Sequence, residues 1–255
     1  PFSDAGLTSI SKLNRLESLS IASGKGITEA GVREIANLSH LKELALLSNG
    51  ITNAGMAHLA RLTSLQSLDL SDPSITVAGI NQLNTLTGLK RLVILESVQD
   101  GAGLDLSALT NLEMLVLNIS THPGTRARTD AIRDEDMRSL GRLTNLRNLQ
   151  VGYSPGLTDA GMAQLAGLTD LERLVVGGEQ VTDDGLAYLL DKKHLWQLNL
   201  TGNFTDQGIC RLTDLVGIRY MEIRSARPLS PRTTHALRNM PNMYSFLESG
   251  YIPGS

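Results

Sequence analysis

The sequence is poor in cysteine, in aromatic residues and in surplus charge of either sign. Its one cysteine, Cys210, cannot form a disulfide within the chain, which argues against a disulfide-rich extracellular scaffold. A formal net charge of -3 gives no general positive field to hold a phosphate backbone, so no nucleic-acid partner is expected. No apolar run is long enough to cross a bilayer, so no membrane insertion is expected.

The sequence also lacks the residue patterns of a metal or catalytic centre. Its histidines lie in separate parts of the chain without the spacing of metal ligands. Cys210 stands among apolar residues with no base nominated to activate it, and is interpreted as a packed side chain. The stretch "DGAG" at 100–103 has no following Lys-Ser/Thr and is interpreted as a turn. We therefore expect no enzyme activity, no cofactor and no metal.

One phrase recurs along the chain. Residues 157–178 read "LTDAGMAQLAGLTDLERLVVGG" and residues 51–72 read "ITNAGMAHLARLTSLQSLDLSD". Alternation of apolar and variable residues in each L-x-x-L-x-L unit predicts a short strand with one buried face. Repeats lie about two dozen residues apart, with one longer step after the fifth. The first positions of the ten units are Leu16, Leu41, Leu65, Leu89, Leu112, Leu146, Leu171, Leu195, Ile218 and Met243.

Ahead of each strand the apolar spacing changes to that of a helix. Met162, Leu165 and Leu168 lie three positions apart, and a Ser or Thr marks each helix start. Aspartates such as Asp159 follow and are interpreted as structural, because a carboxylate suits the positive end of a helix. A glycine comes next in seven repeats, which predicts a close approach by the neighbouring repeat. Such units must stack to bury their apolar faces, which predicts a curved solenoid.

The helix starts "LTDAGM", "VTDDGL" and "FTDQGI" resemble those of leucine-rich repeat proteins, of the cysteine-containing type found in F-box proteins and many bacterial repeat proteins. The resemblance implies an α/β fold in which a parallel sheet lines the concave face and helices cover the convex face. The typical cysteine is absent from the repeated positions, and the turn after the strand has asparagine only at Asn49 and Asn203. We therefore expect no continuous asparagine ladder, and no specific partner follows from the resemblance.

The repeats predict a single domain over residues 1–255, with an insertion at 118–131. The insertion carries Arg126 and Arg128, and is either a tolerated surface loop or a basic arm for an acidic partner. The first repeat begins without a capping segment, so we expect the chain to be a fragment of a longer protein.

Two groups of side chains are predicted on the concave face. Residues two, four and six positions after each first leucine point outward, because side chains alternate along a strand. The middle group is a cluster of apolar side chains expected to be exposed: Val93, Leu95, Met114 and Val116. The second group, toward the C-terminus, holds residue types enriched at interface hot spots: Tyr220 and Arg224 on the face itself, flanked by Trp196, Arg219 and Tyr244.

The sequence favours a non-catalytic protein–protein interaction scaffold that binds its partner on the concave face. The resemblance also implies two alternatives, the substrate-receptor part of a ubiquitin-ligase assembly and a secreted bacterial effector. A carbohydrate-binding or hydrolytic module is a further alternative, although Asp69 and Glu222, the only candidate carboxylates, are too far apart in the repeat order for a catalytic pair. The compartment stays open between the cytoplasm and secretion as an effector, and so does the oligomeric state.

Overall fold

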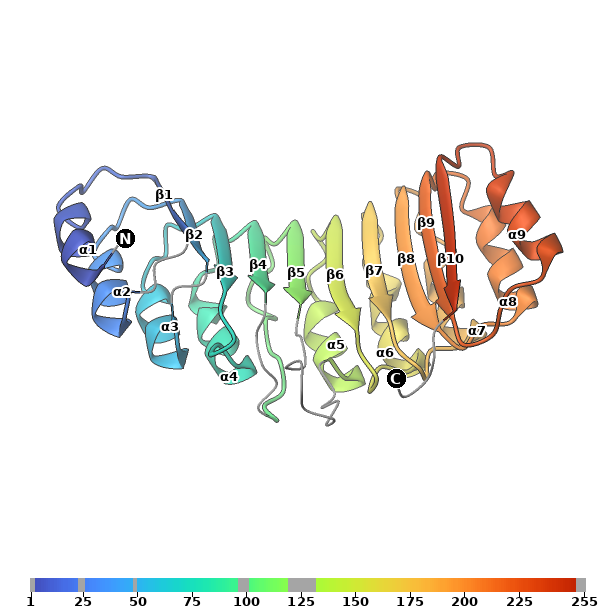
Figure 1. Ribbon diagram of the computed structural model, residues 1–255, viewed down its shortest axis with the longest axis horizontal. Coiled ribbons are helices and arrows are strands. Elements are labelled where there is room, and N and C mark those ends of the chain that lie inside the picture. Colours follow the sequence, from blue (N-terminus) through green and yellow to red (C-terminus); the bar gives the residue numbers. More distant parts are fainter. Residues whose placement is uncertain (1–2, 23–25, 48–49, 96–100, 119–131, 251–255) are drawn as a thin grey trace. The chain divides into compact units, whose positions relative to one another are not determined.

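The computed structural model describes residues 3–22, 26–47, 50–95, 101–118 and 132–250. The chain divides into two compact units, Pro1–Thr129 and Asp130–Ser255. Each unit is a series of repeats in which a strand joins a parallel sheet and a short helix lies on one side of that sheet (Figure 1). The predicted single domain stays a prediction, and the predicted insertion lies outside the described residues except for Asn118.

The first unit pairs its strands in chain order. Its strands are β1 (Ser18–Ala22), β2 (Glu43–Leu47), β3 (Ser67–Ser71), β4 (Arg91–Leu95) and β5 (Met114–Asn118). Its helices are α1 (Asp4–Ile10), α2 (Glu29–Ile35), α3 (Asn53–Leu59), α4 (Val77–Asn81) and the 3-10 helix η1 (Gln82–Thr85). Equivalent repeat positions stand opposite one another, as Leu68 does to Leu92 and Leu92 to Leu115.

The second unit is built in the same way. Its strands are β6 (Asn148–Tyr153), β7 (Arg173–Gly177), β8 (Gln197–Gly202), β9 (Tyr220–Ser225) and β10 (Ser245–Gly250). Its α-helices are α5 (Asp134–Leu140), α6 (Asp159–Met162), α7 (Asp183–Leu186), α8 (Asp206–Cys210) and α9 (Pro231–Arg238). Its 3-10 helices are η2 (Ala163–Gly167), η3 (Ala187–Leu189) and η4 (Arg211–Asp214).

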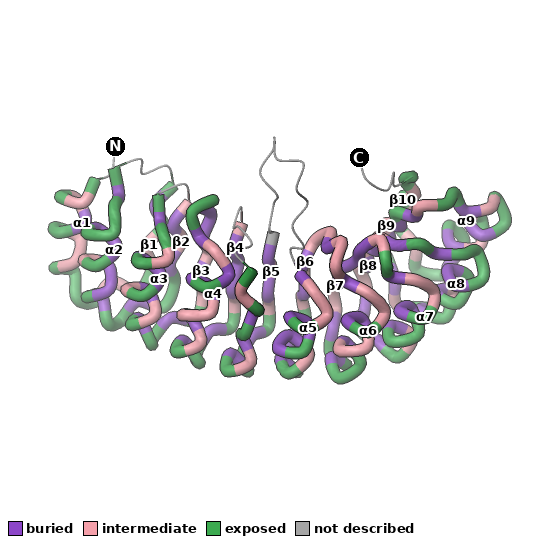
Figure 2. Tube along the Cα trace, turned by 90° about the horizontal axis from the view of Figure 1, so that it is seen from below, coloured by how far each residue is buried: buried purple, intermediate pink, exposed green. Residues whose placement is uncertain are grey.

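The leucines of the repeat form the core of each unit. Leu68, Leu115 and Leu174 are fully buried, and buried positions recur from repeat to repeat along strands and helices (Figure 2). The last repeat departs from the pattern at Glu248, which stands where other repeats have an apolar side chain. Its carboxylate accepts a hydrogen bond from the Leu229 N–H at 2.7 Å. The predicted α/β fold with about ten strand repeats is confirmed.

The helix before the fifth strand, which the turn at 100–103 is expected to shorten, is absent from the described residues. The described residues between β4 and β5, 101–113, form no helix. Asn81 fixes this segment through its side chain, which donates to the Gly103 carbonyl and accepts from the Asp105 N–H, both at 2.8 Å. Asn84 donates in the same way to the Asp105 carbonyl at 2.8 Å. Side chains of the preceding repeat thus satisfy backbone groups that a helix would pair internally.

The aspartates at the helix starts connect one repeat to the next. The Asp134 carboxylate accepts hydrogen bonds from the Thr158 N–H at 2.9 Å and from the Thr158 hydroxyl at 2.6 Å. Further contacts of this kind join Asp4 to Thr28, Asp159 to Thr182, Asp183 to Thr205 and Asp206 to Ser230. We call this series the aspartate ladder. These acids are structural, as predicted, but they act between repeats as well as at their own helix.

The ladder explains the glycine in the four short helices where a ladder carboxylate comes closest, at Gly31, Gly161, Gly185 and Gly208. A Cβ atom at Gly185 would overlap the Asp159 carboxylate, and one at Gly208 would overlap the Asp183 carboxylate. The predicted close approach by the neighbouring repeat is therefore confirmed at these positions. The atoms that come close belong to the capping carboxylate.

Candidate functional site

A row of side chains precedes the strands of each unit, one residue after the first leucine of each repeat. We call it the rim row. In the first unit its members are Glu17, Lys42, Gln66, Lys90 and Glu113, and in the second Arg147, Glu172, Trp196, Arg219 and Tyr244. The backbone fixes the second set, because the Arg219 N–H donates to the Trp196 carbonyl at 2.8 Å and the Tyr244 N–H to the Arg219 carbonyl at 2.7 Å.

Charges in the rim row pair with the next member along the row. Lys42 lies 2.9 Å from Glu17, Lys90 lies 3.7 Å from Glu113, and Arg147 lies 2.8 Å from Glu172. Arg219 differs, because its neighbours in the row are Trp196 and Tyr244. Within the described part of the chain it is the one charged member of the row with no carboxylate at ion-pairing distance.

Three aromatic rings line up beside Arg219. Trp196 meets Tyr220 edge to face, with ring centroids 6.0 Å apart. Tyr220 stacks on Tyr244 at 6.1 Å with an interplanar angle of 14°. Tyr220 is 44% exposed and Tyr244 80% exposed, so much of the line faces solvent. A rigid, exposed aromatic surface of this kind is suited to binding, because covering it with a partner is favourable.

The aromatic line forms part of an open hollow, which we call the rim hollow. Its lining residues are Lys193, His194, Trp196, Gly217, Arg219, Tyr220 and Tyr244. Lys193 and Arg219 are cationic and exposed, His194 is titratable and exposed, and none of the lining residues is acidic. The hollow therefore presents positive charge beside aromatic surface on a chain whose net charge is negative.

Lys192 anchors the segment that carries Lys193 and His194. Lys192 is 1% exposed and stands where other repeats place a buried leucine, as at Leu143 and Leu168. Its ammonium donates to the Ala166 carbonyl at 3.0 Å and to Asp191 at 2.7 Å, so its charge is satisfied at the edge of the core. Sequence reasoning missed Lys192, Lys193 and His194. The sequence contains a signal for them. The third to seventh repeats each have Leu-Thr at this place, three residues before the first leucine of the strand unit, whereas the eighth has Lys192-Lys193.

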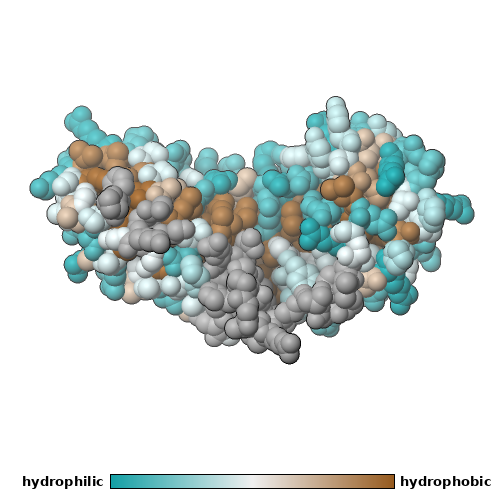
Figure 3. Space-filling model, in the orientation of Figure 1, coloured by the Kyte–Doolittle hydropathy of each residue, from teal (hydrophilic) through white to brown (hydrophobic). Residues whose placement is uncertain are grey.

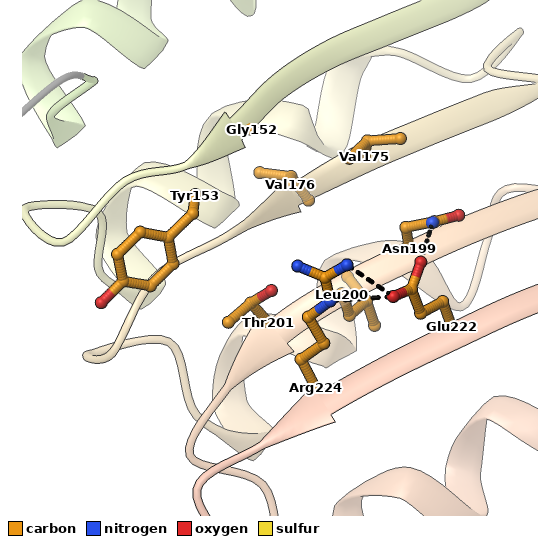
Figure 4. Close-up of a pocket in the computed structure, with 9 residues that line it drawn as sticks. All are labelled: Gly152, Tyr153, Val175, Val176, Asn199, Leu200, Thr201, Glu222 and Arg224. Atoms are coloured by element: carbon orange, nitrogen blue, oxygen red, sulfur yellow. Dashed lines mark hydrogen bonds and ion pairs between the residues drawn. The ribbon is translucent and has the colours of Figure 1, made fainter. Parts of the chain in front are cut away.

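Arg224 lies apart from the other four residues of its predicted group. Its guanidinium donates to Glu222 at 2.8 Å, and Glu222 also accepts from Asn199 at 2.7 Å (Figure 4). These side chains border a second hollow on the sheet face, together with Tyr153 and Thr201. That hollow measures about 130 Å³, which is small for an organic ligand, and its charges are already paired with each other.

The predicted apolar group on β4 and β5 is less exposed than expected. Val93 is only 8% exposed, so its predicted exposure is wrong, and Leu95, Met114 and Val116 are half-buried. Val93 is flanked in the sheet by Asp69 and Val116, while Arg91 reaches across the same face to Asp69 and contacts Met114. Val93 is therefore buried on a face that it shares with longer side chains, among them Arg91 and Met114. On the face drawn in Figure 3, apolar areas are broken up by hydrophilic ones.

Within the described residues, no three His, Cys, Asp or Glu side chains come together as metal ligands would. Nor does the described part of the chain contain a helix with the length and apolar character needed to span a bilayer.

Comparison with known proteins places the fold. No protein-family model matches the sequence, and none of the curated proteins matches it. Solved structures do match. An internalin (inlF) of Listeria monocytogenes has a TM-score of 0.65 at 22% identity, covering 97% of this chain and 73% of its own. A leucine-rich repeat protein of Leptospira interrogans has a TM-score of 0.60 at 18% identity, covering 94% of this chain and 62% of its own.

This chain has the leucine-rich repeat fold. A further match is TLR13 in complex with ssRNA13, with a TM-score of 0.58 at 18% identity over 94% of this chain and 37% of its own. Identities this low show a shared leucine-rich repeat fold and nothing finer. The F-box-type subfamily therefore stays a prediction.

Proposed function

We propose that this leucine-rich repeat chain is a non-catalytic protein-binding scaffold whose main contact surface is the rim hollow of the second unit and the adjoining sheet face. The observation that supports this most directly is the exposed aromatic line of Trp196, Tyr220 and Tyr244. Tyrosine and tryptophan give a large contact area at low conformational cost when their strands are already ordered. Arg219 adds a cation that no described side chain neutralises.

The apolar group of Leu95, Met114 and Val116 is proposed as a secondary contact, because its members are only half-buried. Arg224 belongs to the adjoining sheet face, where a partner would compete with Glu222 for its guanidinium. Carbohydrate chemistry has weaker support. Its two candidate carboxylates are engaged, since Asp69 binds Arg91 at 3.0 Å and Glu222 binds Arg224 and Asn199.

The ubiquitin-ligase receptor and the secreted effector, which the resemblance implies, are both protein-binding roles that this surface could serve. We leave them as alternatives, since the surface does not distinguish them. The negative net charge favours a protein over a nucleic acid, although the structure of TLR13 with ssRNA shows that the fold can be found with RNA.

The test is an alanine scan against a partner isolated with the full chain. We expect at least one of Trp196→Ala, Arg219→Ala, Tyr220→Ala and Tyr244→Ala to lose about 2 kcal/mol or more of affinity. Tyr188→Ala is the matched control, because Tyr188 is an exposed tyrosine on the helix side, 38% exposed in η3. Circular dichroism checks that each variant is folded. Loss of binding in Tyr188→Ala with the other four silent would move the site to the helices and reject the proposal.

A further inference from the structure

We propose that the rim hollow binds an acidic peptide segment that carries an aromatic side chain. This inference rests on the proposed function and names the chemistry of the partner at that site. It follows from the charge pattern of the rim row, the geometry of the aromatic line and the anchoring of the segment that carries Lys193.

Charge complementarity is the first argument. Three cations of the rim row each pair with a carboxylate of a neighbouring repeat. At Arg219 the sequence supplies Trp196 and Tyr244 instead, and Lys193 adds a second cation to the same hollow. A carboxylate from a partner would complete at Arg219 the pairing that the chain itself makes elsewhere in the row. Opposite charges across an interface favour encounter and fix the register of the bound segment.

The aromatic line sets the second requirement. Tyr244 stacks against Tyr220 and is still 80% exposed, so much of its ring surface is open to a further side chain. An aromatic side chain from the partner would extend this stack by one ring, with Arg219 placed beside it. The rings already contact one another at 6.0 and 6.1 Å between centroids, which leaves no slot for a flat group between them.

The third argument is that the hollow is held in place before anything binds. Backbone hydrogen bonds join Trp196, Arg219 and Tyr244 in series. Lys192 ties the neighbouring turn to the Ala166 carbonyl of the preceding repeat at 3.0 Å. A preformed site loses little conformational entropy on binding, so two exposed cations can contribute to affinity. Lys192 is buried with its charge paired to Asp191, so the cation that this turn presents to the hollow is Lys193.

Intrinsic fluorescence gives a direct assay, because Trp196 is the only tryptophan in the chain and lines the hollow. The probe is a short synthetic peptide of glutamates flanking one phenylalanine, titrated into the full chain. Three comparison ligands are the same peptide with lysines for glutamates, the same peptide with alanine for phenylalanine, and an oligouridylate. We expect only the first peptide to shift the Trp196 emission strongly, with an affinity that falls as salt rises.

Variants then separate this inference from a general effect of charge. Arg219→Ala and Lys193→Ala are each expected to weaken binding of the acidic peptide about tenfold, the range for a lost hydrogen bond to a charged group. Lys90→Ala is the matched control, because it removes a rim-row cation of the first unit that is paired with Glu113. It should leave the affinity unchanged. Arg219→Glu should reject the acidic peptide and gain binding of the lysine peptide, a reversal that a purely structural role of Arg219 would not produce.

Several outcomes would overturn the inference. Equal binding of the acidic and lysine peptides, or an unchanged affinity in Arg219→Ala, would show that charge does not select the ligand. A stronger response to the oligouridylate would assign the hollow to nucleic acid. If the isolated partner depends on Trp196 and Tyr244 but not on Lys193 and Arg219, the proposed function stands and the acidic segment is wrong.

Discussion

Asp159 and Thr182 belong to consecutive repeats and share two hydrogen bonds. The Asp159 carboxylate accepts from the Thr182 N–H at 2.8 Å and from the Thr182 hydroxyl at 2.6 Å. The same hydroxyl accepts from the Asp184 N–H at 3.4 Å, so Thr182 caps its own helix while it is held by the preceding one. The start of a helix is thereby fixed by a residue from the neighbouring repeat.

Removing this carboxylate should destabilise the second unit. We expect Asp159→Ala to lower the free energy of unfolding by about 1 to 3 kcal/mol, because it leaves the Thr182 N–H without its acceptor. Asp159→Asn should cost less. Asn53 already bonds Thr76 in this way, accepting from its N–H at 3.0 Å and donating to its hydroxyl at 2.7 Å. Urea denaturation of both variants measures the difference, and equal losses would show that charge matters more than geometry.

Gly185 should resist a substitution that normally helps helices. Replacing a helical glycine by alanine stabilises by about 1 kcal/mol when there is room. At Gly185 the new Cβ would overlap the Asp159 carboxylate, so we expect Gly185→Ala to be destabilising. Gly167→Ala is the control, since the nearest atom to its Cβ would be 3.8 Å away. The loss at Gly185 should shrink in an Asp159→Ala background, which a double-mutant cycle tests.

The lowered pKa values of Asp4 and Asp206 predict a loss of stability in acid. The pKa of Asp206 is lowered from its ordinary value of 3.8, first by the hydrogen bond with the Thr233 side chain and then by the Ser230 N–H. A carboxyl with a lowered pKa in the folded state stabilises fully above its ordinary pKa, and this contribution is lost as the pH falls through the lowered value. Urea midpoints should therefore fall below about pH 4. Asp206→Asn should flatten this dependence, whereas Asp170→Asn, at an exposed aspartate outside the ladder, should not.

Lys192 can be replaced by an apolar side chain of similar length. Because most repeats bury leucine at this position, we expect Lys192→Met to unfold with an unchanged free energy or one raised by about 1 to 4 kcal/mol. Lys192→Ala should lower it by about 2 to 5 kcal/mol, because it leaves a cavity. Urea denaturation distinguishes the two. A large loss in Lys192→Met would show that the contacts with Ala166 and Asp191 are needed for the fold.

Val93 should behave as a buried residue. Val93→Ser is expected to cost about 1 to 3 kcal/mol, since it removes buried methyl groups and places a hydroxyl under Arg91. Leu68→Ala, at a core position, should cost about 2 to 5 kcal/mol, and Val116→Ser, at a half-buried position, should cost least. A cost of Val93→Ser below that of Val116→Ser would mean that Arg91 does not cover Val93.

The repeat could be predicted from sequence because its signal is periodic. Leu68 and Leu115 can be assigned to the core from their place in the repeat. Gly185 can be recognised as a close approach because glycine is unfavourable inside a helix. The partner of Asp159 could not be predicted in the same way, because it depends on how closely one repeat stacks on the next. The burial of Val93 could not be predicted either. Strand alternation places it on the outward face, but its exposure depends on the longer side chains around it, such as Arg91.

The candidate site was predicted in part. Trp196 and Tyr244 drew attention because aromatic residues are scarce in this chain, but their contacts with Tyr220 required coordinates. Strand alternation predicts Arg224 on the same face as Tyr220, but its guanidinium is bonded to Glu222, away from the aromatic rings. Lys193 could have been found by aligning the repeats with one another, since the third to seventh repeats have threonine at this position.

The aspartate ladder gives the second unit a direction. Each carboxylate serves the repeat that follows it, from Asp134 to Thr158 and onward to Asp206 and Ser230. Removing repeats from the N-terminal end would take the carboxylate acceptor away from a helix start and leave its backbone amide to water. Removing repeats from the C-terminal end would leave every remaining helix start with its acceptor, and water would solvate the freed carboxylate. The two ends of the second unit are thus unequal. Fraying should advance more easily from its N-terminal end than from its C-terminal end.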